Sequence, residues 1–266
     1  MKVGLCTIAL RDKLLEDALN VASEVGFDGV EIWGREPHMS MTYDCARVRA
    51  ARRMAEERGL AVSVFGSYLR FGGLPGGNET QNVTVEDAVN TTRGLGTKLC
   101  RVWAGARGSR EASKHYWRQV VDEAAAACET AAQFGITLAV EMHGGTLTDT
   151  AKSTLALLKD VGAPNLKANY QCSFGPQSED PRRRLEAVLP YVVNLHAQNY
   201  VAAPNPEERL ERVGLADGMV DYGQLVSVLA RAGYDGYIEV EFIPEAGGGR
   251  SAALRADCDF LRGLCQ

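Results

Sequence analysis

The fold of this chain is decided by the stretch ITLAVEMHGGTLTDTAKSTLALLKDVGAPNLKANYQ, residues 136–171. It opens with a short apolar run, continues with a segment of helical period that stops at Gly162, and ends in a second short run at 166–171. A strand, a helix and a strand of these lengths predict a βαβ unit. Its two strands are parallel, because the helix returns the chain to the edge where the first strand began.

The same alternation covers the whole sequence. Eight strands are predicted at 2–9, 27–34, 61–67, 98–105, 136–145, 166–171, 192–198 and 234–242. The helices between and after them are predicted at 14–26, 45–59, 84–96, 112–135, 150–162, 181–191, 221–233 and 251–264. Eight such units in 266 residues predict one (β/α)8 TIM barrel domain over residues 1–266. An open doubly wound sheet is the alternative, but the usual Gly-x-Gly-x-x-Gly after its first strand is absent.

The composition and charge of the chain limit the kinds of molecule that it is expected to bind. A net charge of −5 is unlike a surface that binds nucleic acid or an anionic membrane. Seven cysteines without a Cys-x-x-Cys pair are typical of reduced core residues, and we find neither a signal peptide nor a membrane span. We therefore expect a cytoplasmic protein that acts on a small molecule.

Polar residues gather where the last four predicted strands end. Because parallel strands open at one rim of a barrel, side chains at their carboxyl ends converge there. They are Glu141 and His143 on the fifth strand, Asn169 and Gln171 on the sixth, His196 on the seventh and Glu241, with Glu239 behind it, on the eighth. Carboxylates, an amide and an imidazole form a site that suits Mn²⁺, Mg²⁺ or Co²⁺, with Zn²⁺ as an alternative.

The chain resembles the xylose isomerase-like TIM barrels, in particular the divalent-metal sugar isomerases and epimerases. The matching motifs are FDGVEIWG (27–34), RVWAG (101–105), LAVEMHG (138–144), NLHAQN (194–199) and GYDGYIEVEF (233–242). The resemblance implies metal ligands at Glu141, a position on the sixth strand, His196 and Glu241.

The chain departs from this family on its sixth and seventh strands. The family's metal-binding Asp is absent, and Gln171 takes its place, with Asn169 as the alternative. A further family Asp is Asn199 here, and a frequent family His is Phe174. An amide removes one negative charge from the ligand set, so the metal should bind less tightly and act as a stronger Lewis acid.

The family chemistry implies a metal-dependent sugar isomerase or epimerase that abstracts a proton beside a carbonyl. Glu141 and Glu241 would then be bases as well as ligands. His143 could fix Glu141, hydrogen-bond the substrate or act as a general acid or base, and we favour the first two roles. If His143 is the base, elimination becomes attractive, and a metal-dependent lyase or dehydratase on a keto-sugar is the alternative. A non-catalytic sugar-binding barrel is a further one. The related apurinic endonucleases are disfavoured, because four histidines and an acidic chain suit neither three zinc ions nor DNA.

Four residues are candidates for substrate binding. Trp33 and Trp103 end strands at which an indole could stack on a sugar. Asn199 follows the seventh strand, and Arg250 closes the loop EAGGGR, which could hold a phosphate.

Other polar residues are expected to be structural or exposed. Arg101 is predicted to pair with Glu31, whereas His38, Lys114 and His115 are expected on the surface. The loops 68–83 and 199–220 are long enough to form lids, and a homodimer is plausible for a barrel with an outer shell of helices.

Overall fold

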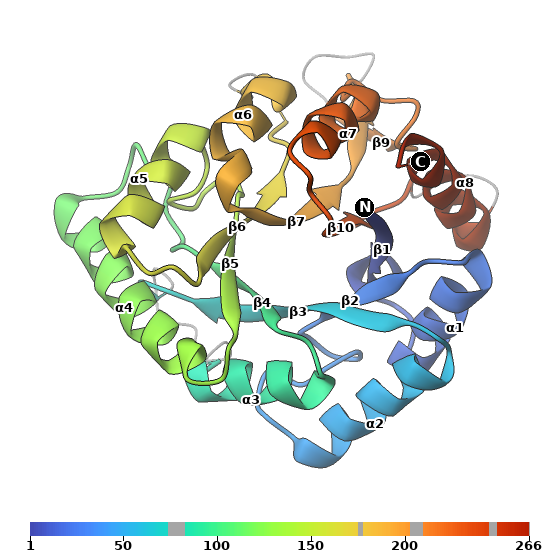
Figure 1. The fold of residues 1–266 in the computed structure, drawn as a ribbon, viewed down its shortest axis with the longest axis horizontal. Helices are drawn as coiled ribbons and strands as arrows, with labels where there is room; N and C mark the ends of the chain where they lie inside the picture. Colours follow the sequence, from blue (N-terminus) through green and yellow to red (C-terminus); the bar gives the residue numbers. More distant parts are fainter. Residues whose placement is uncertain (74–82, 175–177, 203–209, 245–248, 266) are drawn as a thin grey trace.

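The computed structural model forms a closed parallel barrel surrounded by helices (Figure 1). It describes residues 1–73, 83–174, 178–202, 210–244 and 249–265. Around the barrel the strands follow the order β1-β10-β7-β6-β5-β4-β3-β2. The predicted (β/α)8 fold is therefore confirmed.

The barrel strands are short, as the apolar runs predict. They are β1 (Lys2–Cys6), β2 (Gly29–Trp33), β3 (Ala61–Arg70), β4 (Leu99–Trp103), β5 (Thr137–Glu141), β6 (Leu166–Gln171), β7 (Val192–Ala197) and β10 (Tyr237–Val240). The order brings β5, β6, β7 and β10 side by side, so the four strands that carry the predicted ligands form one wall.

The outer helices begin and end at residues with clear local signals. They are α1 (Leu15–Val25), α2 (Cys45–Glu57), α3 (Val85–Leu95), α4 (Lys114–Ala132), α5 (Ala151–Val161), α6 (Pro181–Val188), α7 (Tyr222–Arg231) and α8 (Arg250–Leu264). Thr84 and Thr150 cap α3 and α5 by accepting backbone N–H bonds. Gly96 and Gly162 end the same helices at φ values of 80° and 69°, which glycine adopts without a side-chain clash.

Three segments differ from the predicted elements. β1 ends at Cys6 and continues as a short 3-10 helix, Thr7–Leu10. β3 runs three residues further than predicted, to Arg70. Part of the predicted lid 199–220 is an antiparallel hairpin of β8 (Asn199–Val201) and β9 (Glu211–Val213). Residues 74–82 and 203–209 of the two predicted lids lie outside the described residues.

The apolar core lies between the barrel and the helices, whereas the inside of the barrel is polar. Leu138 and Val140 of β5 and Leu195 of β7 are fully buried in the apolar cluster that includes the helices. Their neighbours Glu141 and His196 contact charged side chains from other strands instead. Each buried aliphatic side chain contributes roughly 1.5–3 kcal/mol, so the outer face of the strands supplies the stability that a polar interior does not.

No helix of the described residues is long and apolar enough to cross a membrane.

Candidate functional site

The barrel mouth brings the four predicted metal ligands together. Glu141 and Gln171 are the last residues of β5 and β6, His196 lies near the end of β7, and Glu241 follows β10. Ligand atoms of Glu141, His196 and Glu241 lie within 4.8 Å of one another. The amide Nε2 of Gln171 donates to Glu241 Oε2 over 2.8 Å, so the fourth side chain joins the same group.

Two atoms of this group are buried without a hydrogen-bond partner. They are Gln171 Oε1 and His196 Nδ1. Nδ1 lies 3.3 Å from Glu241 Oε1, but the geometry is not that of a hydrogen bond. Leaving a buried polar atom unpaired costs about 1–3 kcal/mol, so we expect a bound group to contact these two atoms. An amide oxygen, an imidazole nitrogen and two carboxylates fit a divalent cation as that partner.

Asn169 does not offer its oxygen to this group. Its Oδ1 accepts from Asn194 Nδ2 at 2.8 Å, one step deeper in the barrel. The same Asn194 amide donates to Glu239 Oε2, and Ser63 donates to Oε1 of that glutamate. Burial, reinforced by the charge of Glu31, raises the pKa of Glu239 to about 8. Asn169 and Glu239 thus belong to a polar layer beneath the ligand group.

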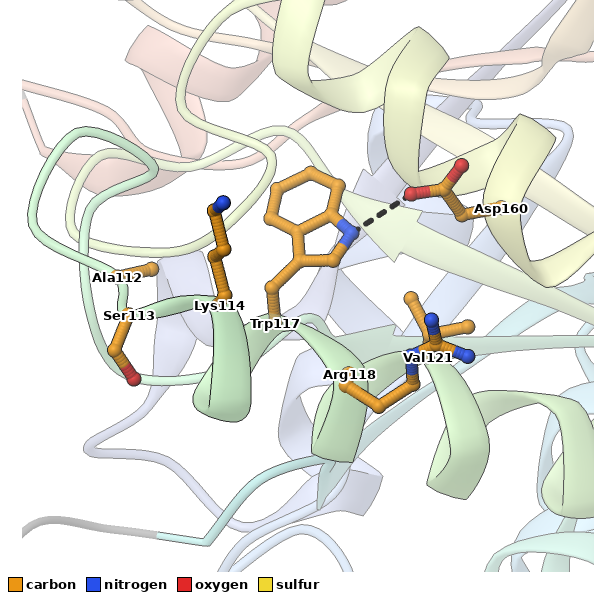
Figure 2. A pocket seen from close by; sticks show the side chains of 7 residues that line it. All are labelled: Ala112, Ser113, Lys114, Trp117, Arg118, Val121 and Asp160. Carbon is orange, nitrogen blue, oxygen red and sulfur yellow. Dashed lines mark hydrogen bonds between the residues drawn. The ribbon is translucent and has the colours of Figure 1, made fainter.

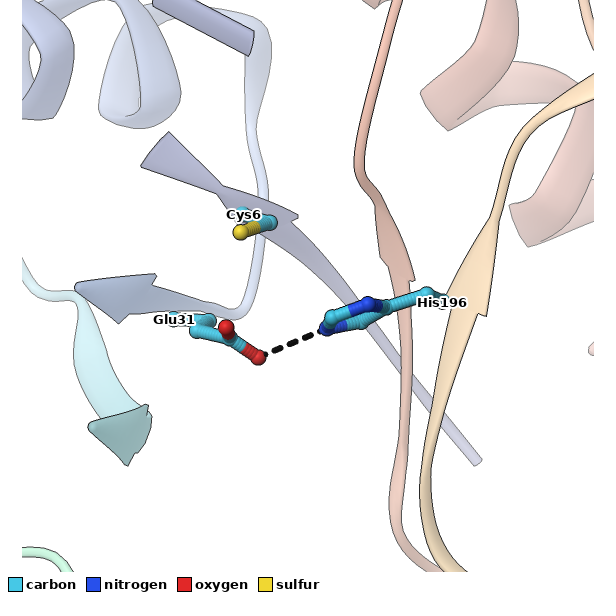
Figure 3. A group of neighbouring side chains, drawn as sticks. All are labelled: Cys6, Glu31 and His196. Carbon is cyan, nitrogen blue, oxygen red and sulfur yellow. Dashed lines mark hydrogen bonds and ion pairs between the residues drawn. The ribbon is translucent and has the colours of Figure 1, made fainter. Parts of the chain in front are cut away.

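A chain of ion pairs connects the ligand group to the other side of the barrel. Arg101 Nε donates to Glu31 Oε1 at 2.8 Å, and its Nη1 donates to Glu141 Oε2 at 2.5 Å. The second oxygen of Glu31 lies 2.8 Å from His196 Nε2 (Figure 3). The predicted Arg101–Glu31 pair is confirmed, and the structure adds the contacts to Glu141 and His196.

Neighbouring charges outweigh burial in setting the pKa values of Glu31 and His196. Burial alone would raise the pKa of Glu31, but Arg101 and His196 hold it well below its usual range. Burial alone would lower the pKa of His196, yet Glu31 and Glu241 raise it above its usual value. The same carboxylates add to burial in raising the pKa of the Cys6 thiol, which lies beside Glu31.

A cavity of about 510 Å³ opens above the ligand group. Two aromatic pairs line it: the ring centroids of Tyr68 and Trp103 stack at 6.0 Å, and those of Phe174 and Tyr200 lie 4.5 Å apart. The lining includes Arg101, Glu141, His143, Gln171, Gln198, Arg212, Glu241 and Phe242. The cavity thus combines three of the four predicted ligands, Glu141, Gln171 and Glu241, with the His143 imidazole and two guanidinium groups.

His143 stands at the rim of this cavity. Its Nδ1 lies 2.6 Å from the Gly144 carbonyl oxygen, which can only accept, so the proton lies on Nδ1. Trp103 packs edge-on against the ring at 5.1 Å. Nε2 is left as a hydrogen-bond acceptor, the form that a general base requires.

Three of the four predicted substrate residues do not line the described cavity. Trp33 contacts the lining without being part of it, because its indole N–H donates to the Tyr68 hydroxyl at 2.8 Å. Asn199 is fully buried, and its amide bonds the backbone of Leu215, Val220 and Tyr200. Arg250 forms an ion pair with Asp12. Only Trp103 lies in the lining.

The histidine His38 corrects one expectation. It is buried rather than exposed, and its ring nitrogens contact the Thr7 hydroxyl at 2.9 Å and the Lys13 carbonyl at 3.1 Å. Thr7 comes directly after β1, so a contact across the chain, invisible in the local sequence, buries the ring.

Several lining residues have no marker in the sequence. Arg212 reaches the cavity from β9, a three-residue strand inside a long polar loop. Tyr68 does so because β3 extends past its predicted end. Tyr68 and Leu69 are the signal that could have extended the predicted strand, since aromatic and aliphatic residues are common in strands.

A second hollow, of about 490 Å³, lies between α4 and α5 (Figure 2). Trp117 of α4 crosses it and donates its indole N–H to Asp160 of α5 at 2.8 Å. Among the described residues that line it, Asp160 is the one carboxylate, and there is no histidine. This hollow therefore lacks the group of carboxylates and imidazole found at the barrel mouth.

Comparison with known proteins shows that the chain is similar to enzymes. Residues 19–264 match the family model described as xylose isomerase-like TIM barrel. A 3-dehydroshikimate dehydratase of Bacillus anthracis is 28% identical over 244 residues, which cover 85% of this chain and 86% of that protein. The structure of the probable 3-DHS dehydratase AsbF from Bacillus anthracis superposes with a TM-score of 0.80 at 26% identity, covering 98% and 99% of the chains. An L-ribulose 3-epimerase gives a TM-score of 0.78 at 17% identity over 99% and 94%.

Proposed function

This chain belongs to the xylose isomerase-like TIM barrel family, and we propose that within it the protein is a divalent-metal-dependent dehydratase. Its substrate would be a hydroxylated keto acid of the kind that 3-dehydroshikimate represents. The proposal rests on one observation: a single cavity joins the His143 imidazole and the Arg212 guanidinium to the carboxylates of Glu141 and Glu241.

The cation would be held by Glu141, Gln171, His196 and Glu241. Gln171 Oε1 and His196 Nδ1 support this assignment, because they are the buried atoms without partners in the group. When bound, a divalent cation supplies positive charge that polarises a substrate carbonyl and stabilises the charge formed beside it.

We assign the base to His143 rather than to a glutamate. Oε2 of Glu141 is engaged by Arg101, and Oε2 of Glu241 accepts from Gln171. Metal binding would engage these carboxylates further. His143 Nε2, by contrast, has no hydrogen-bond partner among the described residues.

The elimination then follows from this imidazole. His143 Nε2 takes the proton from the carbon beside the carbonyl, and the electron pair left behind is delocalised toward the carbonyl oxygen. As that pair forms the new C=C bond, the hydroxyl on the next carbon leaves. His143 returns its proton to this hydroxyl, so the products are water and an unsaturated ketone.

Arg212 supports an acidic substrate. Its guanidinium lies over Phe242, with the central carbon 4.4 Å from the ring centroid, and donates to the Tyr200 hydroxyl at 2.8 Å. Among the described residues no carboxylate forms an ion pair with it. A cation whose neighbours are aromatic rings and a phenol is well placed to bind a substrate carboxylate.

The comparisons favour elimination over the predicted isomerisation. A relative that is 28% identical to this chain is named a dehydratase, whereas the epimerase structure, at 17% identity, supports the fold alone. Elimination and epimerisation begin with the same proton abstraction, so the residues predicted for one reaction serve the other.

The direct test is an assay of chelator-treated protein, with and without Mn²⁺, on 3-dehydroshikimate. Loss of one water from this ring gives an aromatic dihydroxybenzoate, which is followed by its ultraviolet absorption. In parallel, neutral keto-sugars are incubated in D₂O. Epimers of these sugars, with no product from the acid, would contradict the proposal.

Two variants separate the roles of the base and the anion contact. His143→Asn should lower kcat by about 10²–10⁴ while Mn²⁺ affinity stays unchanged, and His115→Asn on α4 is the matched control. Arg212→Gln should raise KM by roughly 10- to 100-fold, the value of a charge-assisted bond, whereas Arg250→Gln should not. Equal effects of Arg212→Gln and Arg250→Gln would exclude the assigned anion contact.

A further inference from the structure

The ion-pair chain beneath the ligand group does more than join two walls of the barrel. Glu31 and His196 are fully buried, Arg101 is 3% exposed, and their three contacts measure 2.5 to 2.8 Å. Two of the contacts reach proposed ligands, Glu141 and His196, and the third joins Arg101 to Glu31, the two residues that make those contacts. These ion pairs are therefore placed to determine which atoms of Glu141 and His196 are available to a cation.

Glu31 decides which nitrogen of His196 faces the ligand group. Its Oε2 is 2.8 Å from Nε2, and a carboxylate oxygen accepts, so the proton lies on Nε2 (Figure 3). Nδ1 is the nitrogen without a partner, and it lies beside Glu241. A hydrogen bond on one ring nitrogen fixes the other as the metal ligand.

Arg101 controls Glu141 in a comparable way. It occupies Oε2 of Glu141, which leaves Oε1 of that carboxylate for a cation. It also offsets the charge of Glu31. The three carboxylates of Glu31, Glu141 and Glu241 and one guanidinium leave a net charge of about −2, which matches a divalent cation.

Strand β3, which lies between the strands of Glu31 and Arg101, leaves room for this arrangement. A Cβ on Gly66 of β3 would overlap Glu31 Oε1 and lie 2.8 Å from Arg101 Nη2. The adjoining group of Cys6, Glu31 and His196 is not a separate cation site, because Arg101 and His196 already occupy both oxygens of Glu31. The atoms nearest to Gly66 on this side all belong to the Glu31–Arg101 ion pair.

We propose that Glu31 and Arg101 are positioning residues for the cation: Glu31 presents His196 Nδ1, and Arg101 restricts Glu141 to one ligand oxygen. The inference rests on the cation site of the proposed function but needs neither the substrate nor the reaction. It can therefore fail while the dehydratase assignment stands.

Glu31→Gln tests the proposal with almost no change of shape. Arg101 can only donate, so the new amide oxygen stays on Arg101, and the amide NH₂ faces His196 Nε2. That NH₂ donates to Nε2, which moves the imidazole proton to Nδ1 and blocks the ligand atom. We expect Mn²⁺ affinity to fall by about 10- to 100-fold.

The experiment is titration calorimetry of chelator-treated protein with Mn²⁺. Asp257→Asn is the matched control, since it removes a carboxylate that is 3% exposed and touches none of the ligands. With Co²⁺ as the probe, the absorption bands of Glu31→Gln should shift as they do in His196→Gln. Wild-type affinity and an unshifted Co²⁺ spectrum in folded Glu31→Gln would overturn the inference alone, whereas no binding by the wild type would overturn the cation site as well.

The wild-type protein carries the test if Glu31→Gln does not fold. In ¹⁵N-labelled protein loaded with Zn²⁺, the His196 resonances should show a metal-bound Nδ1 and a protonated Nε2. Single variants of the other three histidines provide the assignment. A metal-bound Nε2 would refute the role of Glu31.

Discussion

Gln171→Glu offers the sharpest test of the ligand group, because it changes one atom and one charge. In the wild type, Gln171 Nε2 donates to Glu241 Oε2 at 2.8 Å, and both residues are at most 5% exposed. The variant replaces this bond by two carboxylates in contact. It also restores the acid that the sixth strand of the family usually carries.

The cost can be estimated from the distance. A hydrogen bond to a charged group contributes roughly 1.5–3 kcal/mol. Two like charges at 2.8 Å and an effective dielectric constant of 20 repel by about 6 kcal/mol, and rotation to about 5 Å lowers this to roughly 3 kcal/mol. The lost bond and the remaining repulsion together predict that the metal-free variant loses about 4.5–6 kcal/mol of unfolding free energy. For a protein of this size that corresponds to a fall in Tm of about 10 °C.

A bound cation should reverse the sign of the effect. The added carboxylate contributes a negative charge to the ligand set, so Mn²⁺ should bind more tightly and stabilise the variant more than the wild type. The assay is the thermal melt of chelator-treated protein over a series of Mn²⁺ concentrations. Gln198→Glu is the control: it lies in the same cavity, 2.8 Å from the Tyr200 hydroxyl, and touches no carboxylate. A metal-free Tm equal to that of the wild type, or an equal gain with Mn²⁺, would refute the reasoning.

Two further predictions concern the barrel interior and the outer shell. Gly66→Ala should cost about 1–3 kcal/mol of stability and weaken Mn²⁺ binding, since its methyl group displaces the Glu31–Arg101 pair, whereas Gly263→Ala on α8 should be neutral or stabilising in the same melts. Burial raises the pKa of Asp257 to about 6, so the folded state favours its protonated form; that contribution is complete below pH 4 and is lost as the pH rises through 6. Asp257→Asn should therefore be more stable than the wild type by about 1–2 kcal/mol at pH 7.5, with a difference that shrinks toward pH 4 in urea titrations; a constant difference would show that Asp257 does not titrate in this range.

Much of the fold could be predicted from the sequence, because its signals are local. The alternation of apolar runs with helical periods, and glycines such as Gly162 at helix ends, depend on residues close together in the chain. The carboxyl-terminal position of Glu141, Gln171 and His196 on their strands was equally readable, since a parallel barrel brings every such end to one rim.

Only the tertiary structure decided how these residues are used. Whether Gln171 or Asn169 faces the ligand group depends on strand register. The hydrogen bond between Asn194 and Asn169 shows that Asn169 lies deeper in the barrel than Gln171. The burial of His38, the internal bonds of Asn199 and the entry of Arg212 into the cavity depend on contacts between distant segments. A local pattern records whether a side chain faces in or out, but the partner that satisfies a buried charge is set by the closure of the barrel, as it is for Glu31, Arg101 and His196.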